Sequence, residues 1–434
     1  MRPFLAMLRD SFRESIDRRA LFVLLAVSCL ATLFCFSIAF EKEAPELVLR
    51  RQARRLDTIR HGNSLVHFDG SMPLEFDVVR VAPVSADAPA PPGHAAAELL
   101  VELEFAHEHE LNAMVHSWAA FLEGYPDDLS RYDAPVGEAA RRGYLRERFE
   151  GFGYADVGVV EGVLRAKAAE DARAYRVFVA GAESYRVAGA HRLSIGFGTL
   201  AVGLEGTSVQ EVVFTIQKVL AEAIAGFVGL LIVLSTSASF IPAMLQKGAL
   251  DLMLARPVSR TRLLLYKYAG SVSFVAVLAV LLFSGCSLGL AVSTGFFNPW
   301  FLACALTLVA VFAILYAVAV PLGVLTRSGN MATLGALGVW GLESTVSQLR
   351  ASDDVLPAWL RAGLEGLHTL LPKLSDLTGL NERFLARTPL ADEAAARVIA
   401  EPADLDWLFI LSTTGAFTLL MLGGAVWLFR RRDW

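Results

Sequence analysis

Long uncharged stretches alternate with polar regions along this chain, and their lengths give the first prediction. A helix that crosses the hydrocarbon core of a bilayer needs about 20 predominantly apolar residues. Residues 20–40, 223–246 and 407–429 contain no Asp, Glu, Lys or Arg. A further uncharged stretch, residues 268–326, is long enough for two crossings. The pattern therefore predicts a membrane protein that crosses the bilayer several times.

The longest stretch divides at TGFFNPW, residues 294–300, whose Gly, Asn and Pro favour a tight turn. A weaker apolar segment, residues 331–349, carries Glu343 and is expected to form a fifth span. We therefore predict an α-helical polytopic membrane protein with six transmembrane helices. The predicted spans are residues 20–40, 208–246 (which includes an outer stalk), 268–293, 300–326, 331–349 and 405–429.

Residues 41–207 form a polar region that is large enough for a domain with its own core. Apolar side chains at Val101, Leu103 and Phe105 alternate with glutamates, which predicts a half-buried strand. Residues 138–150 are expected to be helical. In RLSIGFGTLAVGL the apolar phase changes at Gly198, which predicts a β-bulge. This region is therefore expected to be an α+β extracytoplasmic domain between the first and second spans.

The second span is expected to begin before its apolar core. Ser208 and Glu211 have the spacing of a capping box, which marks the start of a helix. The following residues contain no helix-breaking proline until Pro242. The sequence therefore predicts one unbroken helix whose first part forms the stalk.

Lysine and arginine in the short loops indicate the orientation, because they are enriched on the cytoplasmic side of membranes. Residues 1–19 contain five Arg, residues 247–267 are basic, and the tail 430–434 begins with three Arg. With six spans these segments share one side, so both termini are expected to be cytoplasmic. Residues 350–404, with six Lys or Arg and nine Asp or Glu, are expected on the outer side.

The N-terminal segment is expected to stay attached. Phe4, Leu8, Phe12 and Ile16 recur at helical spacing, which predicts an amphipathic helix in the membrane interface. A plain extension of the first span is the alternative. The apolar run of residues 20–40 is longer than a typical signal peptide core, so we expect an uncleaved anchor.

Candidate chemical sites are few. His107, His109 and His116 lie close together in the sequence, and the first two continue the phase of the strand before them, so they are weak metal-site candidates. A surface or hydrogen-bonded histidine group is the simpler interpretation. Glu343 is a possible polar site inside the membrane, because ionisable residues there often have a function. Gly285 and Gly289 have a spacing that permits close helix contact.

Several catalytic patterns are absent from the sequence. It has no Gly-x-x-x-x-Gly-Lys-Ser/Thr loop for nucleotide phosphates and no Gly-x-Ser-x-Gly elbow. The four cysteines all lie in apolar segments and support neither a disulfide nor a zinc site. The chain is therefore expected to be non-catalytic and to bind no cofactor directly.

The basic segment 247–267 joins the second and third spans and has a pattern of its own. Residues 249–255 can form two helical turns with Leu250 and Leu254 on one face and Met253 beside them. Pro257 disfavours helix at the preceding residue, and Ser259 can cap the next helix. We expect a short cytoplasmic helix that presents an apolar surface. A solvated basic loop that only sets the topology is the alternative.

Residues 247–270, KGALDLMLARPVSRTRLLLYKYAG, resemble the coupling-helix segment of ABC-2 type transporter permeases. That segment commonly reads Lys-Gly-Thr-Leu-Glu-Leu-Leu-Leu, followed by Arg/Ser-Pro-Val-Ser-Arg. Many members carry acidic residues just before the Lys-Gly pair, whereas this chain has Ala-Met-Leu-Gln at 243–246. The resemblance implies that the segment binds a separate ATPase. The implied ATPase-coupling residues are Lys247, Gly248, Leu250, Asp251, Met253, Leu254, Arg256, Pro257 and Arg260.

The resemblance also implies a function. The chain would be the permease subunit of an ABC transporter in the bacterial cytoplasmic (inner) membrane, paired with a second permease as a homodimer or heterodimer. ATP and magnesium would bind to the partner nucleotide-binding subunit. Membrane lipid and an envelope protein at the extracytoplasmic domain are further expected partners, and nucleic acid is not. The alternative is a membrane-anchored receptor or scaffold that binds an envelope partner without transport.

Overall fold

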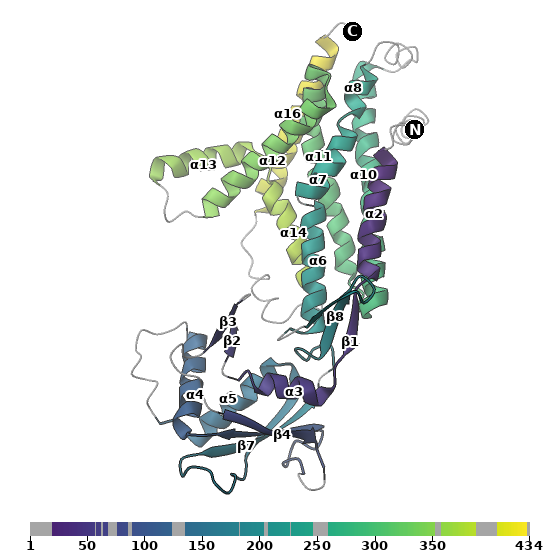
Figure 1. Cartoon of the computed structure of the whole chain (residues 1–434). Coiled ribbons are helices and arrows are strands. Elements are labelled where there is room, and N and C mark those ends of the chain that lie inside the picture. The colour runs from purple at the N-terminus through teal and green to yellow at the C-terminus, as the bar shows by residue number, and fades with distance from the viewer. Residues whose placement is uncertain are drawn as a thin grey trace. The chain divides into compact units, whose positions relative to one another are not determined.

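The computed structural model describes most of the chain as two compact units. The described residues are 20–56, 58–61, 64–67, 76–85, 89–123, 135–181, 183–203, 207–225, 227–245, 259–351, 357–387 and 406–431. The helical unit lies within Met1–Ile38 and Val213–Trp434, and the α+β unit is Ala39–Val212. Figure 1 labels the elements of both units, and each unit is described by itself.

Helix α11 occupies the middle of the helical unit. It packs against α10, α12, α14 and α16, and two thirds of its most apolar window is buried (67%) (Figure 1). The helices of this unit are α2 (Ala20–Phe36), α6 (Val209–Ala225), α7 (Phe227–Ser237), α8 (Phe240–Met244), α10 (Arg260–Thr294), α11 (Pro299–Thr326), α12 (Gly329–Ala351), α13 (Ala358–Leu370), α14 (Leu374–Ala386) and α16 (Trp407–Arg431).

Four stretches among the described residues are long and apolar enough to cross a membrane. They are Val209–Met244, α10, α11 and α16. Helix α2 is a shorter apolar helix of 17 residues, and its rise of about 25 Å is less than the hydrocarbon thickness of about 30 Å. The predicted first span was too long at its C-terminal end, because α2 ends at Phe36 and the chain enters a strand at Ala39. Helix α12 covers the predicted fifth span but is not among these four.

The turn between α10 and α11 follows the predicted pattern. Helix α10 ends at Thr294, and Gly295 adopts the left-handed conformation with φ of 79°, which a glycine tolerates. The Asn298 side chain accepts a hydrogen bond from the Trp300 amide at 3.1 Å and so caps α11. Its Nδ2 donates to Gln217 Oε1 of α6 at 2.8 Å. The fully buried Asn298 therefore ties the turn to a third helix.

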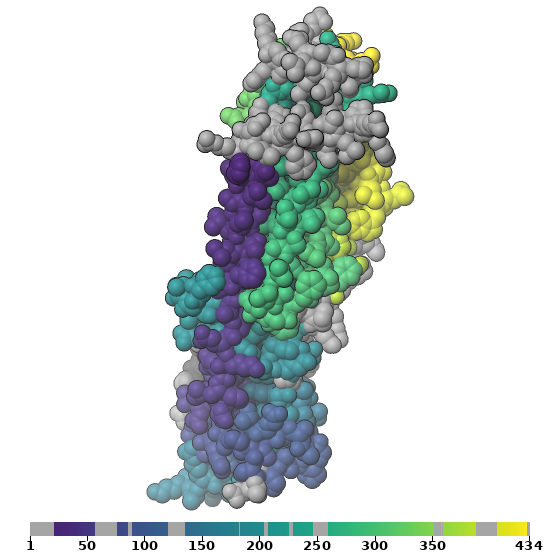
Figure 2. Space-filling model, turned by 90° about the vertical axis from the view of Figure 1, so that its right-hand side faces the viewer, coloured from purple at the N-terminus to yellow at the C-terminus, as the bar shows by residue number. Residues whose placement is uncertain are grey.

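Close packing of α10 against α2 explains the two spaced glycines of the third span. A Cβ atom on Gly285 would lie 2.4 Å from Thr32 Oγ1, and one on Gly289 would lie 2.9 Å from Cys35 Cβ. Figure 2 shows α2, in purple, alongside α10. Small residues let two helices approach closely in a membrane, where packing drives association.

The prediction of one unbroken helix up to Pro242 was wrong, because α7 ends at Ser237 and α8 begins at Phe240. The predicted cap is present, since the Glu211 amide donates to Ser208 Oγ at 3.1 Å. Helices α6 and α7 flank residue 226, which lies outside the described residues. A Cβ on Gly229 would lie 1.7 Å from the Ile224 carbonyl oxygen, so regular helix geometry is lost there. Glycine weakens a helix interior.

The α+β unit contains a four-stranded antiparallel sheet in the order β4-β5-β7-β6. Its core includes Val101, Leu103 and Phe105, as their alternation predicted, and Phe149 of the predicted helix 138–150. The strands of this sheet are β4 (Phe76–Pro83), β5 (Leu99–Phe105), β6 (Tyr154–Glu161) and β7 (Arg173–Gly181), and the accompanying helices are α3 (Pro45–Ala53), α4 (Glu108–Glu123) and α5 (Glu138–Gly151).

Two smaller sheets complete the α+β unit. The strand pair β2 (Thr58–His61) and β3 (Ser64–His67) is antiparallel. The other small sheet has the order β1-β8-β9, with strands β1 (Ala39–Lys42), β8 (His191–Ile195) and β9 (Leu200–Gly203).

The predicted bulge at Gly198 is a hairpin turn. Strand β8 ends at Ile195, and its partner β9 begins at Leu200, opposite Ile195. Gly196, Phe197 and Gly198 all have positive φ, which reverses the chain direction. A reversal and a bulge both change the apolar phase of a strand, so the sequence pattern alone did not separate them.

Candidate functional site

Most of the predicted ATPase-coupling residues lie outside the described residues. These are Lys247, Gly248, Leu250, Asp251, Met253, Leu254, Arg256 and Pro257. Arg260 is described and is the first residue of α10. The predicted coupling segment is hereafter residues 246–258, and the structure shows what holds its two ends, α8 on one side and α10 on the other.

The upstream end of the coupling segment is fixed by tight packing of α8. Phe240, Ile241 and Met244 are all 2% exposed or less. A Cβ on Gly323 of α11 would lie 3.4 Å from the Pro242 ring, and one on Gly329 of α12 would lie 3.0 Å from Ser239 Cα. The chain therefore enters the coupling segment from a helix that is packed against both α11 and α12.

The downstream end is fixed by a cap and by buried residues of α10. The Arg262 amide donates to Ser259 Oγ at 3.4 Å, which starts α10 at the predicted position. Leu263, Leu264 and Lys267 follow on the buried face and are each 1–2% exposed. The first two turns of α10 are therefore part of the packed unit.

Tyr316 of α11 links three helices near these ends. Its hydroxyl lies 3.0 Å from Ser271 Oγ of α10 and donates to the Ser237 carbonyl oxygen of α7 at 3.4 Å. Its ring stacks with Tyr268 at 5.8 Å between centroids and with Phe312 at 5.2 Å. The Tyr268 hydroxyl donates to the Ala313 carbonyl oxygen at 2.9 Å. Through these contacts α11 is bonded directly to α7 and to α10.

Glu343 is a docking residue for α14 in the structure. Its side chain is buried on α12, at 2% exposure. One carboxylate oxygen accepts the Ser375 amide at 3.1 Å, and the other accepts the Ser375 hydroxyl at 3.0 Å. A negative side chain at the first turn of a helix also complements the helix dipole. The Glu343 carboxylate thus joins two helices, and its position inside a membrane stays a prediction.

A buried lysine lies beside this contact. Lys373 is fully buried, and its Nζ donates to the Leu371 carbonyl oxygen at 2.9 Å and also to that of His368. Its amide donates to Thr414 Oγ1 of α16 at 3.1 Å, and its Nζ lies 5.3 Å from the Phe409 ring centroid. The junction of α13 and α14 is therefore bonded to α16 as well as to α12.

Helix α14 has further anchors toward its C-terminal end. Lys218 Nζ of α6 lies 2.7 Å from Glu382 Oε1. The Phe384 ring stacks on Trp300 of α11 at 6.3 Å, and the Arg387 guanidinium lies over the same indole at 5.1 Å. Helices α6, α11, α12 and α16 thus hold α14 and its N-terminal junction, a segment for which the sequence predicts no helix.

Contrary to the prediction from the sequence, His107 and His109 do not extend the preceding strand. Strand β5 ends at Phe105, and α4 begins at Glu108, so His107 precedes the helix and His109 and His116 lie in it. The strand phase does not continue through His109, because Glu108 and Glu110 form a favourable acidic first turn of α4. The His107 and His109 rings stack at 5.4 Å.

The hydrogen-bond partner of His107 is an aspartate. The His107 Nδ1 atom lies 3.1 Å from Asp171 Oδ2, and this hydrogen bond lowers the pKa of the Asp171 carboxyl. Within the described ranges, no group of three or more His, Cys, Asp or Glu side chains is placed to hold a metal ion.

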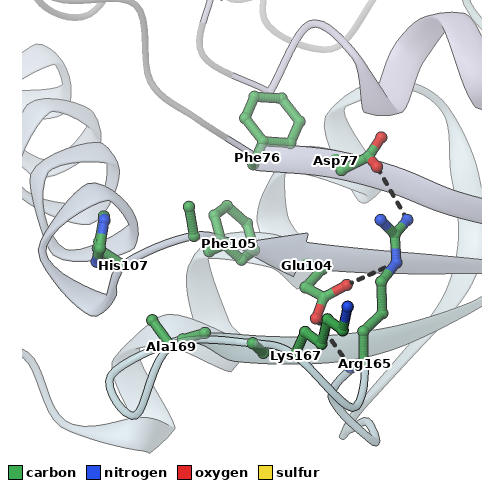
Figure 3. Close-up of a pocket in the computed structure, with 11 residues that line it drawn as sticks. Phe76, Asp77, Glu104, Phe105, His107, Arg165, Lys167 and Ala169 are labelled. Carbon is green, nitrogen blue, oxygen red and sulfur yellow. Dashed lines mark hydrogen bonds and ion pairs between the residues drawn. The ribbon is translucent and has the colours of Figure 1, made fainter.

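A pocket of about 740 Å³ opens at the ends of β4 and β5 in the α+β unit (Figure 3). The rings of Phe76 and Phe105 stack at 5.6 Å and give it an apolar wall. Arg165 lies 2.9 Å from Asp77 and 3.1 Å from Glu104, so its charge is balanced by two carboxylates. The pocket can accept an apolar group beside a rim of mixed charge.

A packed bundle of apolar helices joined to an α+β unit defines a polytopic membrane protein with a folded polar domain. Comparison with protein families identifies its class. The chain belongs to the ABC-2 transporter family, since the model described as "ABC-2 family transporter protein" matches residues 94–434. This confirms the family predicted from the coupling segment. A search of curated proteins gave no match.

Proposed function

We propose that this chain is the permease subunit of an ABC-2 type transporter. It would move a substrate across the bacterial cytoplasmic membrane with ATP that a separate nucleotide-binding subunit hydrolyses. The family match over residues 94–434 carries this proposal. The packed helices at both ends of residues 246–258 support it, because a coupling segment must transmit force to the helices that it joins.

The proposed topology has six spans. The helices α2 and α12 are added to the four long apolar stretches, so that both termini and the coupling segment are cytoplasmic. The basic residues of the segments 1–19, 247–267 and 430–434 favour this orientation. Residues 41–207 and 350–404 then lie on the outer side, with α13 and α14 among them.

The proposed mechanism places residues 247–258 in a groove of the ATPase subunit. ATP-driven closure of two ATPase subunits would displace these segments in two paired permeases. The displacement would reach α11 through α8 packing and through the contacts of Tyr316 with Ser271 and Ser237. Packed helices respond to such a shift by switching between discrete arrangements. This chain contributes the substrate pathway and the ATPase-binding segment 247–258, while ATP and magnesium bind to the ATPase subunit.

A double substitution in the proposed ATPase-binding segment 247–258 tests the function. Leu250→Asp with Leu254→Asp should abolish co-purification with the co-expressed nucleotide-binding subunit, because two carboxylates would be buried in an apolar groove. Membrane insertion should be unchanged, since the segment lies outside the spans. Affinity capture of the tagged permease followed by quantification of the ATPase measures the effect.

Leu252→Asp is the matched control. Position 252 lies about 200° around a helix from position 250, so its side chain faces away from the proposed contact. This variant should retain the ATPase. Co-purification of the ATPase with the double variant at the wild-type level would contradict the proposed coupling role.

A further inference from the structure

Three exposed apolar side chains gather on the β8–β9 hairpin. Phe197 in the turn is 69% exposed, and Leu200 and Val202 of β9 are 64% and 50% exposed. Leu200 and Val202 are two residues apart in a strand and so point to the same face. The stretch from Leu193 to Gly203 contains no charged residue. This hairpin is therefore an uncharged surface on a polar unit.

The strand register fixes which end of the sheet carries the turn. Ala39 of β1 pairs with Ser194, and Lys42 pairs with His191. Strand β8 therefore runs toward the Ala39 end of β1, and the turn at 196–199 follows at that same end. The charged pair Glu41 and Arg192 lies further along the sheet, away from the turn.

Chain connectivity ties that end of the sheet to the membrane. Helix α2 ends at Phe36, three residues before Ala39, and three residues of extended chain reach at most about 11 Å. Leu33 and Phe34 in the last turn of α2 are exposed, as lipid-facing residues are (54% and 43%). At whatever angle the sheet leaves the helix, its uncharged end starts within this short distance of the apolar helix.

The turn itself suits a water-poor environment. Thr199 Oγ1 donates to the Gly196 carbonyl oxygen at 2.9 Å and lies 3.3 Å from that of Ile195. Backbone groups that enter lipid need such internal partners. Phe197 adopts φ of 56°, a conformation that is costly for a bulky residue and easy for glycine. The turn therefore carries an exposed aromatic ring at a position where the backbone favours glycine.

We propose that the β8–β9 hairpin is an interfacial anchor whose partner is the lipid bilayer. Phe197, Leu200 and Val202 enter the leaflet on the side of the α+β unit, to the depth of about 5–10 Å that is typical of interfacial elements. Glu41 and Arg192 stay at the headgroups. The anchor holds the base of the α+β unit against the membrane beside its exit from α2.

Depth-dependent fluorescence quenching tests the anchor in the full chain. A fluorescent non-natural amino acid replaces Phe197, and the protein is reconstituted into nanodiscs of phosphatidylcholine with or without bromine on the acyl chains. Brominated lipid should strongly reduce the emission at position 197. The same probe at Val163, an 83% exposed residue between β6 and β7, should be unaffected. Equal emission from position 197 in both lipids would overturn the proposal.

A second pair of positions tests the gradient along the sheet. A probe at Leu200 should be quenched by brominated lipid more than a probe at Arg192, because the charged row lies away from the turn. Shielding of position 197 from aqueous iodide both in detergent and in nanodiscs, without any effect of bromine, would indicate a protein partner and would also overturn the proposal.

Discussion

The two units of this protein differ in how their polar side chains are distributed: most of the ion pairs among the described residues lie in the α+β unit, where the buried Arg141 also donates to Asn112. In the helical unit, buried polar groups join one helix to another, as Glu343 does with Ser375 and Asn298 with Gln217. In the α+β unit the sheet core is apolar, and many charged groups pair near its surface, as Arg146 does with Glu150. Lipid gives helices little hydrophobic reason to associate, so hydrogen bonds and close packing position them.

The comparison predicts which kind of substitution each unit tolerates least. A polar deletion between helices should loosen the helical unit, whereas a cavity in the core should destabilise the α+β unit. The following predictions are ordered from the largest expected effect to the smallest.

Phe149→Ala should destabilise the α+β unit by about 3–5 kcal/mol, because it leaves a cavity in an apolar core. Phe149 is fully buried and packs against Phe152 and Tyr154. Urea unfolding followed by near-ultraviolet circular dichroism measures the change. Capture of the ATPase subunit should persist, because the coupling segment belongs to the other unit. Loss of both the near-ultraviolet signal and the ATPase capture would show that the two units unfold together.

Glu343→Ala should weaken the attachment of α14 by about 1.5–3 kcal/mol, because the Ser375 amide and hydroxyl lose a charged acceptor. Hydrogen–deuterium exchange in detergent should show faster exchange in α14 and unchanged exchange in α5. Glu343→Gln retains an acceptor oxygen and is the matched control, with a smaller effect. Unaltered exchange in α14 of the alanine variant would contradict the docking role.

Gly285→Leu should separate α2 from α10, at a cost of about 1–3 kcal/mol for overpacking. Even a Cβ at this position would lie 2.4 Å from Thr32 Oγ1. The melting temperature in detergent should fall. Gly338→Leu on α12 is the control, because no atom lies within 4 Å of a Cβ placed there. Similar losses for both variants would mean that any large side chain is harmful, independent of the α2 contact.

The smallest expected effect is on the pH dependence of the stability of the α+β unit. Burial, with a further contribution from the charge of Lys42, lowers the pKa of His191 below its ordinary value of 6.5. The unfolded chain therefore binds this proton more readily, so stability is full above about pH 6.5 and falls as the pH drops toward the folded pKa. His191→Gln should reduce the loss in melting temperature between about pH 7.5 and 5.5. An identical pH dependence in both proteins would exclude this histidine as the source.

Local signals in the sequence predicted local structure well. The predicted caps at Ser208 and Ser259 start helices in the structure, the predicted turn over 294–300 separates α10 from α11, and the alternation over 101–105 lies in β5. Each of these depends on neighbours a few residues apart, which the sequence displays directly. The family was also recognisable from a short segment, because the coupling pattern is specific.

Features that depend on distant partners were missed. No local pattern indicates that Glu343 binds Ser375 or that Lys218 pairs with Glu382, and so α13 and α14 were not predicted. The predicted continuation of the strand through His109 was wrong, because the acidic residues Glu108 and Glu110 favour the start of α4 there. The break between Ser237 and Phe240 and the close approach of Gly229 to Ile224 depend on packing, which periodicity does not report.

The hydroxyl groups around Tyr316 have a consequence for motion. Ser271 Oγ lies within hydrogen-bond distance of the Lys267 carbonyl oxygen and of Tyr316, and Tyr316 also reaches the Ser237 carbonyl oxygen. Two hydroxyl hydrogens serve these three contacts, so one contact is always without a proton. If α7 moves away from α11, Tyr316 can rotate its hydrogen to Ser271 and lose little energy. The proton arrangement thus gives this junction a low-cost way to exchange one helix partner for another.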